Sequence, residues 1–191
     1  MHADFIRERL ARYQRQVVDD AAVQRAAVAL ILRQESQVTE FLAIHRSERE
    51  GDPWSGHMAF PGGRQHAADR DLHATAIRET LEEVGIDLER TGESIGCLDD
   101  LRAIGNRRRL DLVISPCVYL LNTPVTPVLN PVEVQKAIWI PLVNLRHPDT
   151  KGTYRYMLDG FETHHDAFVV EGHAIWGLTY RILDRFLDVL A

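Results

Sequence analysis

Cysteine is scarce in this 191-residue chain, which contains only Cys97 and Cys117. Both lie within apolar, strand-like segments, and their spacing matches neither a disulfide framework nor a zinc motif. We therefore expect two buried free thiols and a reducing, cytoplasmic compartment. Long apolar runs are lacking as well. No stretch approaches the roughly 20 residues needed to span a bilayer, so no membrane is expected as a partner.

Positive charge is also in short supply, because 22 Lys and Arg residues face 28 Asp and Glu residues, for a net charge of −6. Such a chain creates no field that would attract a nucleic-acid backbone, so no nucleic acid is expected as a partner. The expected partner is a small molecule instead. A hydrophobic content of 45% suffices for a substantial core, and residues 1–191 are expected to form one domain.

Apolar periodicity predicts amphipathic helices at both ends of the chain, over residues 4–17 and about 174–190. These helices could cover a sheet or build a homodimer. Strand-like segments bounded by turn-forming residues are expected at 26–32, 41–44, 94–98, 112–121 and 137–140, with a hairpin made by 154–158 and 167–170. Strands interleaved with a few helices indicate an α/β fold, in which a mixed sheet flanked by helices has its core over residues 26–182.

One further helix, expected over residues 71–84, carries the most informative residues. Asp69 and Asp71 are available as N-caps, and Gly85 supplies a C-terminal stop. The expected buried stripe consists of Ala74, Ile77, Leu81 and Val84.

Opposite that stripe, Glu79, Glu82 and Glu83 occupy positions i, i+3 and i+4, which places three carboxylates on one surface. A solvated acidic helix face would explain them if they stood alone. The turn Phe60-Pro61-Gly62-Gly63 precedes the helix, however, and paired glycines let backbone groups approach a phosphate or a metal closely. Mg²⁺ prefers oxygen ligands, and an ion held here could neutralise a diphosphate and activate a water. Arg78 could brace Glu82 or contact a phosphate, although an ordinary ion pair on the helix surface explains it equally well.

The segments from Gly63 to Asp69 and from Arg78 to Ile86 resemble the Nudix box. Three points differ from the family pattern: Asp69 replaces a Glu, the spacer to Arg78 is one residue longer, and Thr80 stands at an apolar position. The resemblance implies an α/β/α sandwich, a requirement for Mg²⁺ or Mn²⁺, and hydrolysis of a nucleoside diphosphate linked to another moiety. It implies these roles: Glu79, Glu82 and Glu83 as metal ligands, the Gly63 carbonyl as a further ligand, and Glu82, Glu79 and Arg78 as catalytic residues.

Three other segments are similar to the Nudix branch that cleaves coenzyme A and its thioesters, namely Phe60-Pro61-Gly62-Gly63-Arg64, Leu98-Asp99-Asp100 and Ile175-Trp176-Gly177-Leu178-Thr179. This similarity implies cleavage of coenzyme A or acyl-CoA to adenosine 3′,5′-bisphosphate and (acyl-)phosphopantetheine. The upstream signature of that branch differs here, since Asp52 stands in place of an Arg. The alternative substrates are ADP-ribose, NADH, a dinucleoside polyphosphate and an oxidised nucleotide, and the alternative class is a non-catalytic nucleotide-binding module.

Several residues outside the helix are candidates for binding the nucleotide substrate. Arg46, His57 and Arg64 are expected to contact it. Trp54 could stack on a base beside His57 or pack in the core, whereas Trp176 is expected in the core.

The water-activating base often lies outside the box in this family. Glu133 is one candidate, with a structural carboxylate as the alternative. A polar cluster expected in a loop offers others, with a hydrated hairpin tip as the alternative: Glu162, His164, His165 and Asp166. The basic run from Arg107 to Arg109 could bind the ribose 3′-phosphate of coenzyme A or simply solubilise a turn.

Overall fold

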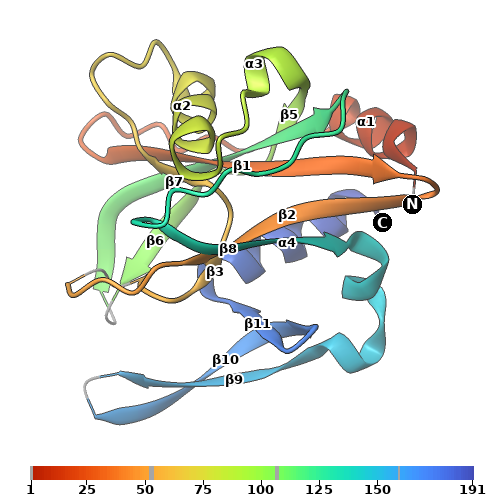
Figure 1. Ribbon diagram of the computed structural model, residues 1–191. Coiled ribbons are helices and arrows are strands. Elements are labelled where there is room, and N and C mark those ends of the chain that lie inside the picture. The colour runs from red at the N-terminus through yellow and green to blue at the C-terminus, as the bar shows by residue number, and fades with distance from the viewer. Residues whose placement is uncertain (1, 52–53, 106–107, 159) are drawn as a thin grey trace.

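The computed structural model describes residues 2–51, 54–105, 108–158 and 160–191. Its centre is a mixed eight-stranded sheet in which β3, β2, β1, β7 and β5 follow one another, while β4 pairs with β1, β6 with β7 and β8 with β2 (Figure 1). The strands are β1 (Gln24–Glu35), β2 (Val38–Arg46), β3 (Met58–Ala59), β4 (Gly62–Arg64), β5 (Gly92–Cys97), β6 (Leu101–Gly105), β7 (Arg108–Leu121) and β8 (Val134–Pro141). β1 and β7 run parallel, and the other pairs are antiparallel.

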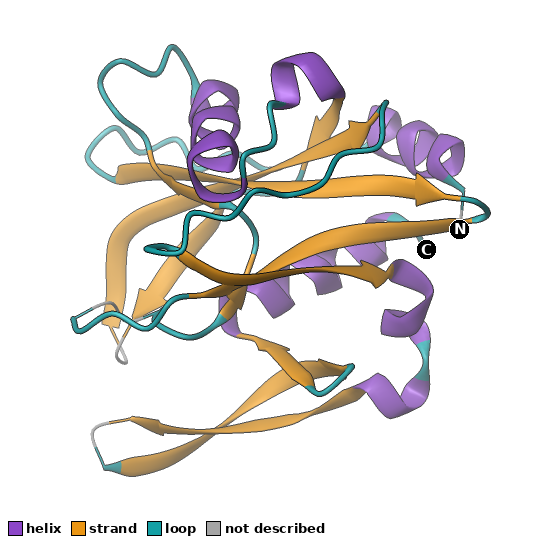
Figure 2. Cartoon of the chain, in the orientation of Figure 1, coloured by secondary structure: helices purple, strands orange, loops and turns teal. Residues whose placement is uncertain are grey.

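Helices cover both faces of this sheet (Figure 2). They are α1 (Ala3–Arg12), α2 (Leu72–Val84), α3 (Leu88–Thr91) and α4 (Gly177–Val189). Side chains alternate between the two faces of a strand. Ala29 and Ile31 of β1 therefore belong to the core layer under α2 and α3, while Leu30 and Leu32 belong to the layer under α1 and α4. This arrangement confirms the predicted α/β/α sandwich, and both terminal helices cover the sheet; the homodimer remains a prediction.

A smaller sheet of three strands lies beside α4 and the main sheet (Figure 1). Its strands are β9 (Lys151–Leu158), β10 (Phe161–Val170) and β11 (His173–Trp176), and the 3₁₀ helices η1 (Leu142–Arg146) and η2 (Pro148–Thr150) lead into it from β8. The predicted hairpin is confirmed, but β10 pairs with β9 along nearly its whole length. The polar cluster from Glu162 to Asp166 therefore lies within a strand, and its prediction as a loop is wrong. Only the last part of β10 is apolar and buried, so only that part looked like a strand.

The N-terminal helix is shorter than predicted, since it ends at Arg12. Beyond it, the backbone N–H of Gln16 donates to Asp99 at 2.7 Å, and that of Val18 donates to Asp100 at 3.0 Å. These donors are satisfied by carboxylates from another part of the chain, so the segment runs extended where the apolar spacing predicted a helix.

The C-terminal helix begins three residues later than predicted, at Gly177. Residues 173–176 pair with β10 as a strand instead. Among the described residues, no helix is both long enough and apolar enough to cross a membrane.

Candidate active site

Helix α2 begins and ends as its sequence predicts. The Asp71 carboxylate accepts a hydrogen bond from the backbone N–H of Ala74 at 2.8 Å, and Gly85 ends the helix with φ at 65°. The buried face differs from the predicted stripe, because Leu81 is 50% exposed. The buried residues of the helix are Thr75, Ala76, Glu79, Thr80, Glu83 and Val84. The Thr80 hydroxyl donates to the Ala76 carbonyl at 2.7 Å, which satisfies a polar group at a position that is apolar in the Nudix pattern.

Two of the three glutamates thus point toward the sheet, where they meet the backbone of Gly62 and Gly63 in β4. The Gly62 N–H donates to the Glu83 carboxylate at 2.9 Å. A Cβ atom at Gly63 would lie 2.5 Å from the carboxyl carbon of Glu79, and one at Gly62 would lie 2.3 Å from the carbonyl oxygen of Ala27. Any larger residue would clash at either position, so the glycine pair lets the β4 backbone lie against both carboxylates.

Burial strongly affects the charge of these two glutamates. Glu83 is only 2% exposed, and burial raises its pKa to about 8. Burial also raises the pKa of Glu79, which is 9% exposed. The nearest positive charge to Glu83 is the Arg46 guanidinium, at 3.8 Å. Glu79 is compensated by the Arg78 guanidinium, 2.8 Å away, but the more deeply buried Glu83 has Arg46 only at 3.8 Å. Two buried carboxylates beside a closely approaching backbone suit a hard divalent cation, which binds oxygen ligands.

Glu82 is placed differently, because its side chain is on the solvent side of α2. Among the described residues, the three carboxylates do not form a cluster close enough to share one ion as they stand. Arg78 lies between two of them and donates to Glu79 at 2.8 Å and to Glu82 at 3.2 Å. Joint coordination by all three would require Glu82 to turn toward Glu79.

Asp69, which differs from the Nudix pattern, holds Arg78 in place. The Nε and Nη2 atoms of Arg78 donate to the Asp69 carboxylate at 3.0 and 2.9 Å, and Nη2 also donates to the Arg64 carbonyl at 3.1 Å. Arg78 holds the pKa of Asp69 well below its usual range, and Asp69 raises the pKa of Arg78. Each nitrogen of the Arg78 guanidinium thus has a protein acceptor, and the ion pair with Glu79 holds that carboxylate in place.

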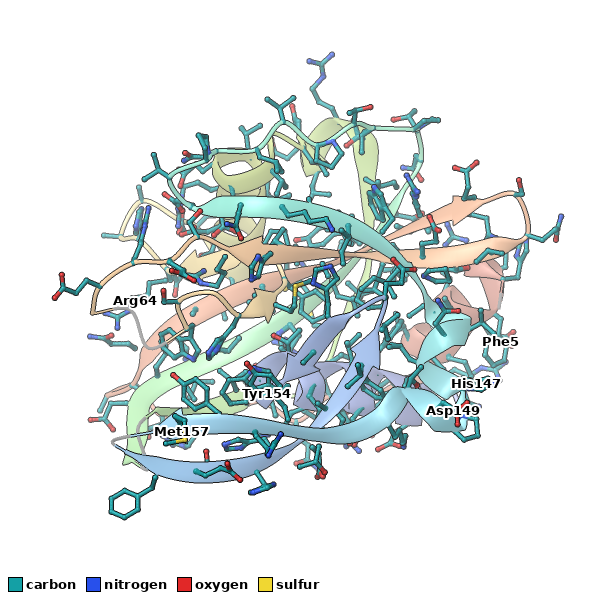
Figure 3. All side chains as sticks on the ribbon, turned by 60° about the horizontal axis from the view of Figure 1, so that its bottom comes forward. Phe5, Arg64, His147, Asp149, Tyr154 and Met157 are labelled. Atoms are coloured by element: carbon teal, nitrogen blue, oxygen red, sulfur yellow. The ribbon has the colours of Figure 1, made fainter. Side chains whose placement is uncertain are left out.

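A cavity of about 700 Å³ opens next to this carboxylate site. Its lining includes Arg46, Gly62, Gly63 and Arg64, together with residues of the small sheet such as Tyr156, His165 and Trp176. Figure 3 views the molecule from the side of that sheet, with Arg64 beyond the strand that carries Tyr154 and Met157. Three of these lining residues, Arg46, Gly62 and Gly63, also lie against Glu79 or Glu83, so the cavity and the carboxylates form one continuous site.

Aromatic rings form a wall of this cavity around Trp176. Its ring centroid lies 4.5 Å from His57, 4.8 Å from Tyr156 and 4.9 Å from His165, and Tyr154 stacks on it at 5.1 Å. His57 lies at the cavity as predicted, and Trp54 lines it too. The prediction that Trp176 belongs to the core is wrong. An apolar segment alone does not reveal this, because the cavity forms only when the small sheet packs beside β3.

The candidate bases are separated by the fold. Within the predicted polar cluster, Glu162 and His164 are exposed and bond to each other at 2.9 Å, whereas His165 lines the cavity. Glu133 lies 3.8 Å from Arg49, which lines the cavity. Burial is the main cause of the raised pKa of Glu79 and Glu83, and the negative charge of Glu133 adds to it.

Two features considered in the sequence, the run from Arg107 to Arg109 and Asp52, fall at or beside residues that the structure does not describe. Asp52 and Arg107 lie outside the described residues. The side chains of Arg108 and Arg109 are likewise not described.

Comparison with known proteins adds independent information. The model of the NUDIX domain family matches residues 23–161. The chain is 32% identical over 154 residues to the peroxisomal coenzyme A diphosphatase ndx-8 of Caenorhabditis elegans, covering 78% of this chain and 56% of that protein. It is 30% identical over 167 residues to the mitochondrial coenzyme A diphosphatase NUDT8 of Homo sapiens, covering 87% and 69%.

The chain spans about half the length of the first curated relatives it matches, 56% of the worm protein and 48% of a Schizosaccharomyces pombe protein that is 37% identical. Among solved structures, the NUDIX domain of Shewanella oneidensis NrtR in complex with ADP ribose has a TM-score of 0.51 at 21% identity, over 78% of this chain and 89% of that one. The likeness to the NrtR domain shows that the two chains share a fold.

Proposed function

Because this chain belongs to the Nudix family, we propose that it hydrolyses the diphosphate linkage of coenzyme A or an acyl-CoA. The expected products are adenosine 3′,5′-bisphosphate and (acyl-)phosphopantetheine. Two relatives that carry the name coenzyme A diphosphatase support this substrate. The cytoplasmic location remains a prediction, since their names place those relatives in peroxisomes and mitochondria.

One observation carries the proposal: the same glycine pair that contacts the buried glutamates also lines the large cavity. A diphosphate lying against Gly62 and Gly63 would place its two substituents along the cavity. Aromatic faces stack on nucleobases, so the wall around Trp176 suits the adenine ring. Arg46, His57 and Arg64 are the proposed contacts of the remaining groups.

Mg²⁺ or Mn²⁺ would be held by Glu79, Glu82 and Glu83, with the Gly63 carbonyl as a further proposed ligand. When bound, such an ion supplies charge neutralisation for the diphosphate and a lower pKa for the attacking water. The chain itself supplies the rest. Arg78 keeps the Glu79 carboxylate in place, and the Gly62 N–H orients the carboxylate of Glu83.

Glu133 is the proposed base that takes the proton of the attacking water. Its negative charge adds to the rise in the pKa of both buried glutamates, which supports this proposal. Its side chain is about one-third exposed and lies 3.8 Å from Arg49, so water can reach the carboxylate. His165 is the second candidate, because it lines the cavity.

A substrate panel tests the proposal. The purified chain is incubated with Mg²⁺ or Mn²⁺ and with coenzyme A, an acyl-CoA, ADP-ribose, NADH, a dinucleoside polyphosphate or an oxidised nucleotide, and the products are separated by chromatography. We expect adenosine 3′,5′-bisphosphate from coenzyme A. Brisk turnover of one of the other compounds, without cleavage of coenzyme A or the acyl-CoA, would contradict the proposed substrate. Saturable nucleotide binding without turnover of any compound would contradict the proposed enzymatic activity and indicate a non-catalytic regulatory module.

A further inference from the structure

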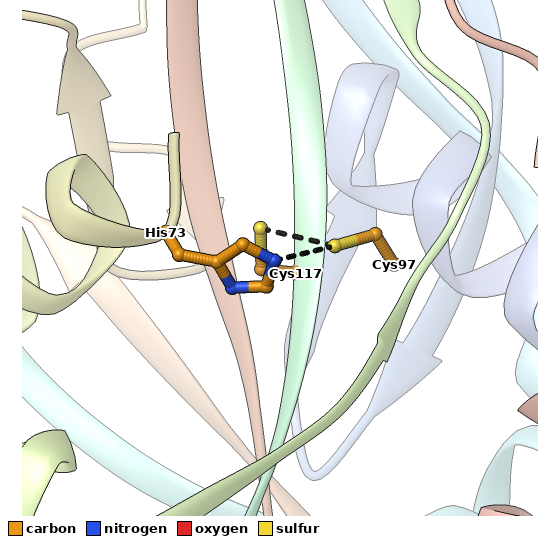
Figure 4. A group of neighbouring side chains, drawn as sticks. All are labelled: His73, Cys97 and Cys117. Carbon is orange, nitrogen blue, oxygen red and sulfur yellow. Dashed lines mark hydrogen bonds between the residues drawn. The ribbon is translucent and has the colours of Figure 1, made fainter. Parts of the chain in front are cut away.

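We propose that His73, Cys97 and Cys117 bind a Zn²⁺ ion at a second metal site, distinct from the carboxylate site. Figure 4 shows the three side chains converging, His73 from the first turn of α2, Cys97 from the end of β5 and Cys117 from β7. One ligand atom from each lies within 4.8 Å of the other two. Both thiols are free, as expected, although only Cys117 is buried and Cys97 is half-buried.

Strand pairing explains why the two cysteines meet. Cys97 and Cys117 are direct partners across β5 and β7, and the N–H of Leu98 donates to the carbonyl of Pro116 at 2.9 Å. This bond pattern makes the cysteines a non-hydrogen-bonded pair, the type in which the side chains of an antiparallel ladder lie closest together. Their separation of 20 positions along the chain conceals the pairing from any search for short motifs.

The distances suit tetrahedral zinc. The two Sγ atoms lie 3.4 Å apart, and Nε2 of His73 lies 3.4 Å from Sγ of Cys97. With Zn–S bonds of about 2.3 Å and Zn–N bonds of about 2.0 Å, tetrahedral ligands are separated by roughly 3.5 to 3.8 Å. Two of the three ligand pairs thus need to move only a few tenths of an ångström, and His73 and Cys117 need to move closer together.

Tyr119 orients the imidazole for this role. Its hydroxyl lies 3.1 Å from Nδ1 of His73 and donates to the His73 carbonyl at 3.5 Å. A hydroxyl that donates its own proton accepts the one on Nδ1, which leaves the lone pair of Nε2 facing Cys97. Histidines that bind metals usually have their second ring nitrogen held by an outer hydrogen bond of this kind.

The donor set separates this site from the carboxylate site. Thiolates and imidazole select Zn²⁺ over Mg²⁺, which prefers oxygen. Cys117 is buried, whereas His73 and Cys97 are half-buried, so an ion can enter from the surface and a water can complete the tetrahedron. A disulfide is the competing outcome, because non-hydrogen-bonded partners also have a suitable Cα separation. The zinc site is favoured because it gives His73 a function that a disulfide does not need.

Titration with Co²⁺, a spectroscopic substitute for Zn²⁺, tests the proposal. The full chain is reduced, freed of metal and titrated while the charge-transfer absorption of a cobalt–thiolate bond is followed. We expect one equivalent per chain and displacement of the band by Zn²⁺. Cys97→Ser and His73→Gln should lose the band or need at least tenfold more metal, and circular dichroism confirms that each variant is folded. Tyr119→Phe, which removes only the outer hydroxyl, should weaken binding by about 10-fold to 100-fold.

Glu83→Gln serves as the matched control, because it alters the carboxylate site and should leave the thiolate band unchanged. A wild-type chain without a thiolate band would overturn the zinc site, and so would an undiminished band in Cys97→Ser. Loss of both free thiols in air, with no metal bound to the reduced chain, would overturn it in favour of the disulfide. Each of these readouts is independent of whether the chain hydrolyses coenzyme A.

Discussion

Glu83→Gln should stabilise the metal-free protein while abolishing its proposed function. The carboxylate is 2% exposed, and its pKa is raised by burial from 4.5 in the unfolded chain to about 8. A glutamine of nearly the same shape can still accept the hydrogen bond from Gly62, and it carries no charge to desolvate. The substitution therefore removes the advantage that ionisation of Glu83 gives the unfolded chain, in which water solvates the carboxylate.

The sign and size of the effect follow from proton linkage. Between pH 4.5 and pH 8 the folded wild-type protein binds more protons than the unfolded chain, so its free energy of unfolding falls as the pH rises. One pKa unit corresponds to about 1.4 kcal/mol. On this basis the free energy of unfolding of the variant should exceed that of the wild type by less than about 1 kcal/mol at pH 5, by about 3 kcal/mol at pH 7 and by about 4 kcal/mol at pH 8.

Urea unfolding in the presence of a chelator, followed by circular dichroism from pH 5 to pH 8, measures the difference. Glu82→Gln is the matched control on the same helix, and its exposed side chain should change the free energy of unfolding by no more than about 0.5 kcal/mol. Saturating Mg²⁺ at 100 times its dissociation constant should stabilise the wild type alone by about 2.7 kcal/mol. If Glu83→Gln is less stable than the wild type at pH 7, or if its advantage does not grow with pH, the burial argument is refuted.

Three further experiments probe the rest of the site. Gly63→Ala places a methyl group 2.5 Å from the carboxyl carbon of Glu79 and should lower kcat by about 100-fold. The control Gly152→Ala, whose added carbon meets nothing closer than 3.6 Å, should leave kcat unchanged. Equal kcat values for the two variants would contradict the argument that the backbone must approach the carboxylate closely. Trp176→Ala removes the stacking wall and should raise KM for coenzyme A by about tenfold with a smaller change in kcat. An unchanged KM would show that the adenine ring does not stack on Trp176. Asp69→Asn and Arg78→Met should be strongly non-additive in turnover, with a coupling energy of about 1 to 3 kcal/mol in a double-mutant cycle; additive effects would show that the two side chains act separately.

The predicted helix α2 shows how much local sequence determines. An Asp cap and a glycine stop act within one or two turns, so they define the ends of the helix without reference to the rest of the chain. The spacing of Glu79, Glu82 and Glu83 on that helix and the presence of the glycine pair before it were also readable from the sequence. The alternation of strand-like and helical segments was sufficient to predict a mixed sheet flanked by helices, and the resemblance to the Nudix box implied the α/β/α sandwich.

Local patterns failed where distant groups compete for the backbone or cover a face. The segment after Arg12 is extended because carboxylates near residue 100 accept its N–H groups. The buried face of α2 could not be predicted from hydrophobicity, since Leu81 is exposed while Glu83 is buried. A helix buries the face that its neighbours contact, and here the neighbour is a glycine backbone that leaves room for carboxylates.

The sequence alone determined which carboxylates are available for a metal, because their spacing is a property of one helix. Only the tertiary structure decided that two of them are buried against a glycine backbone. It also decided that Trp176 lines a cavity and that His73, Cys97 and Cys117 converge. The physical reason is the same in each case: desolvation and ligand geometry depend on which strands and helices pack together, and residues many positions apart carry no local signal of that packing.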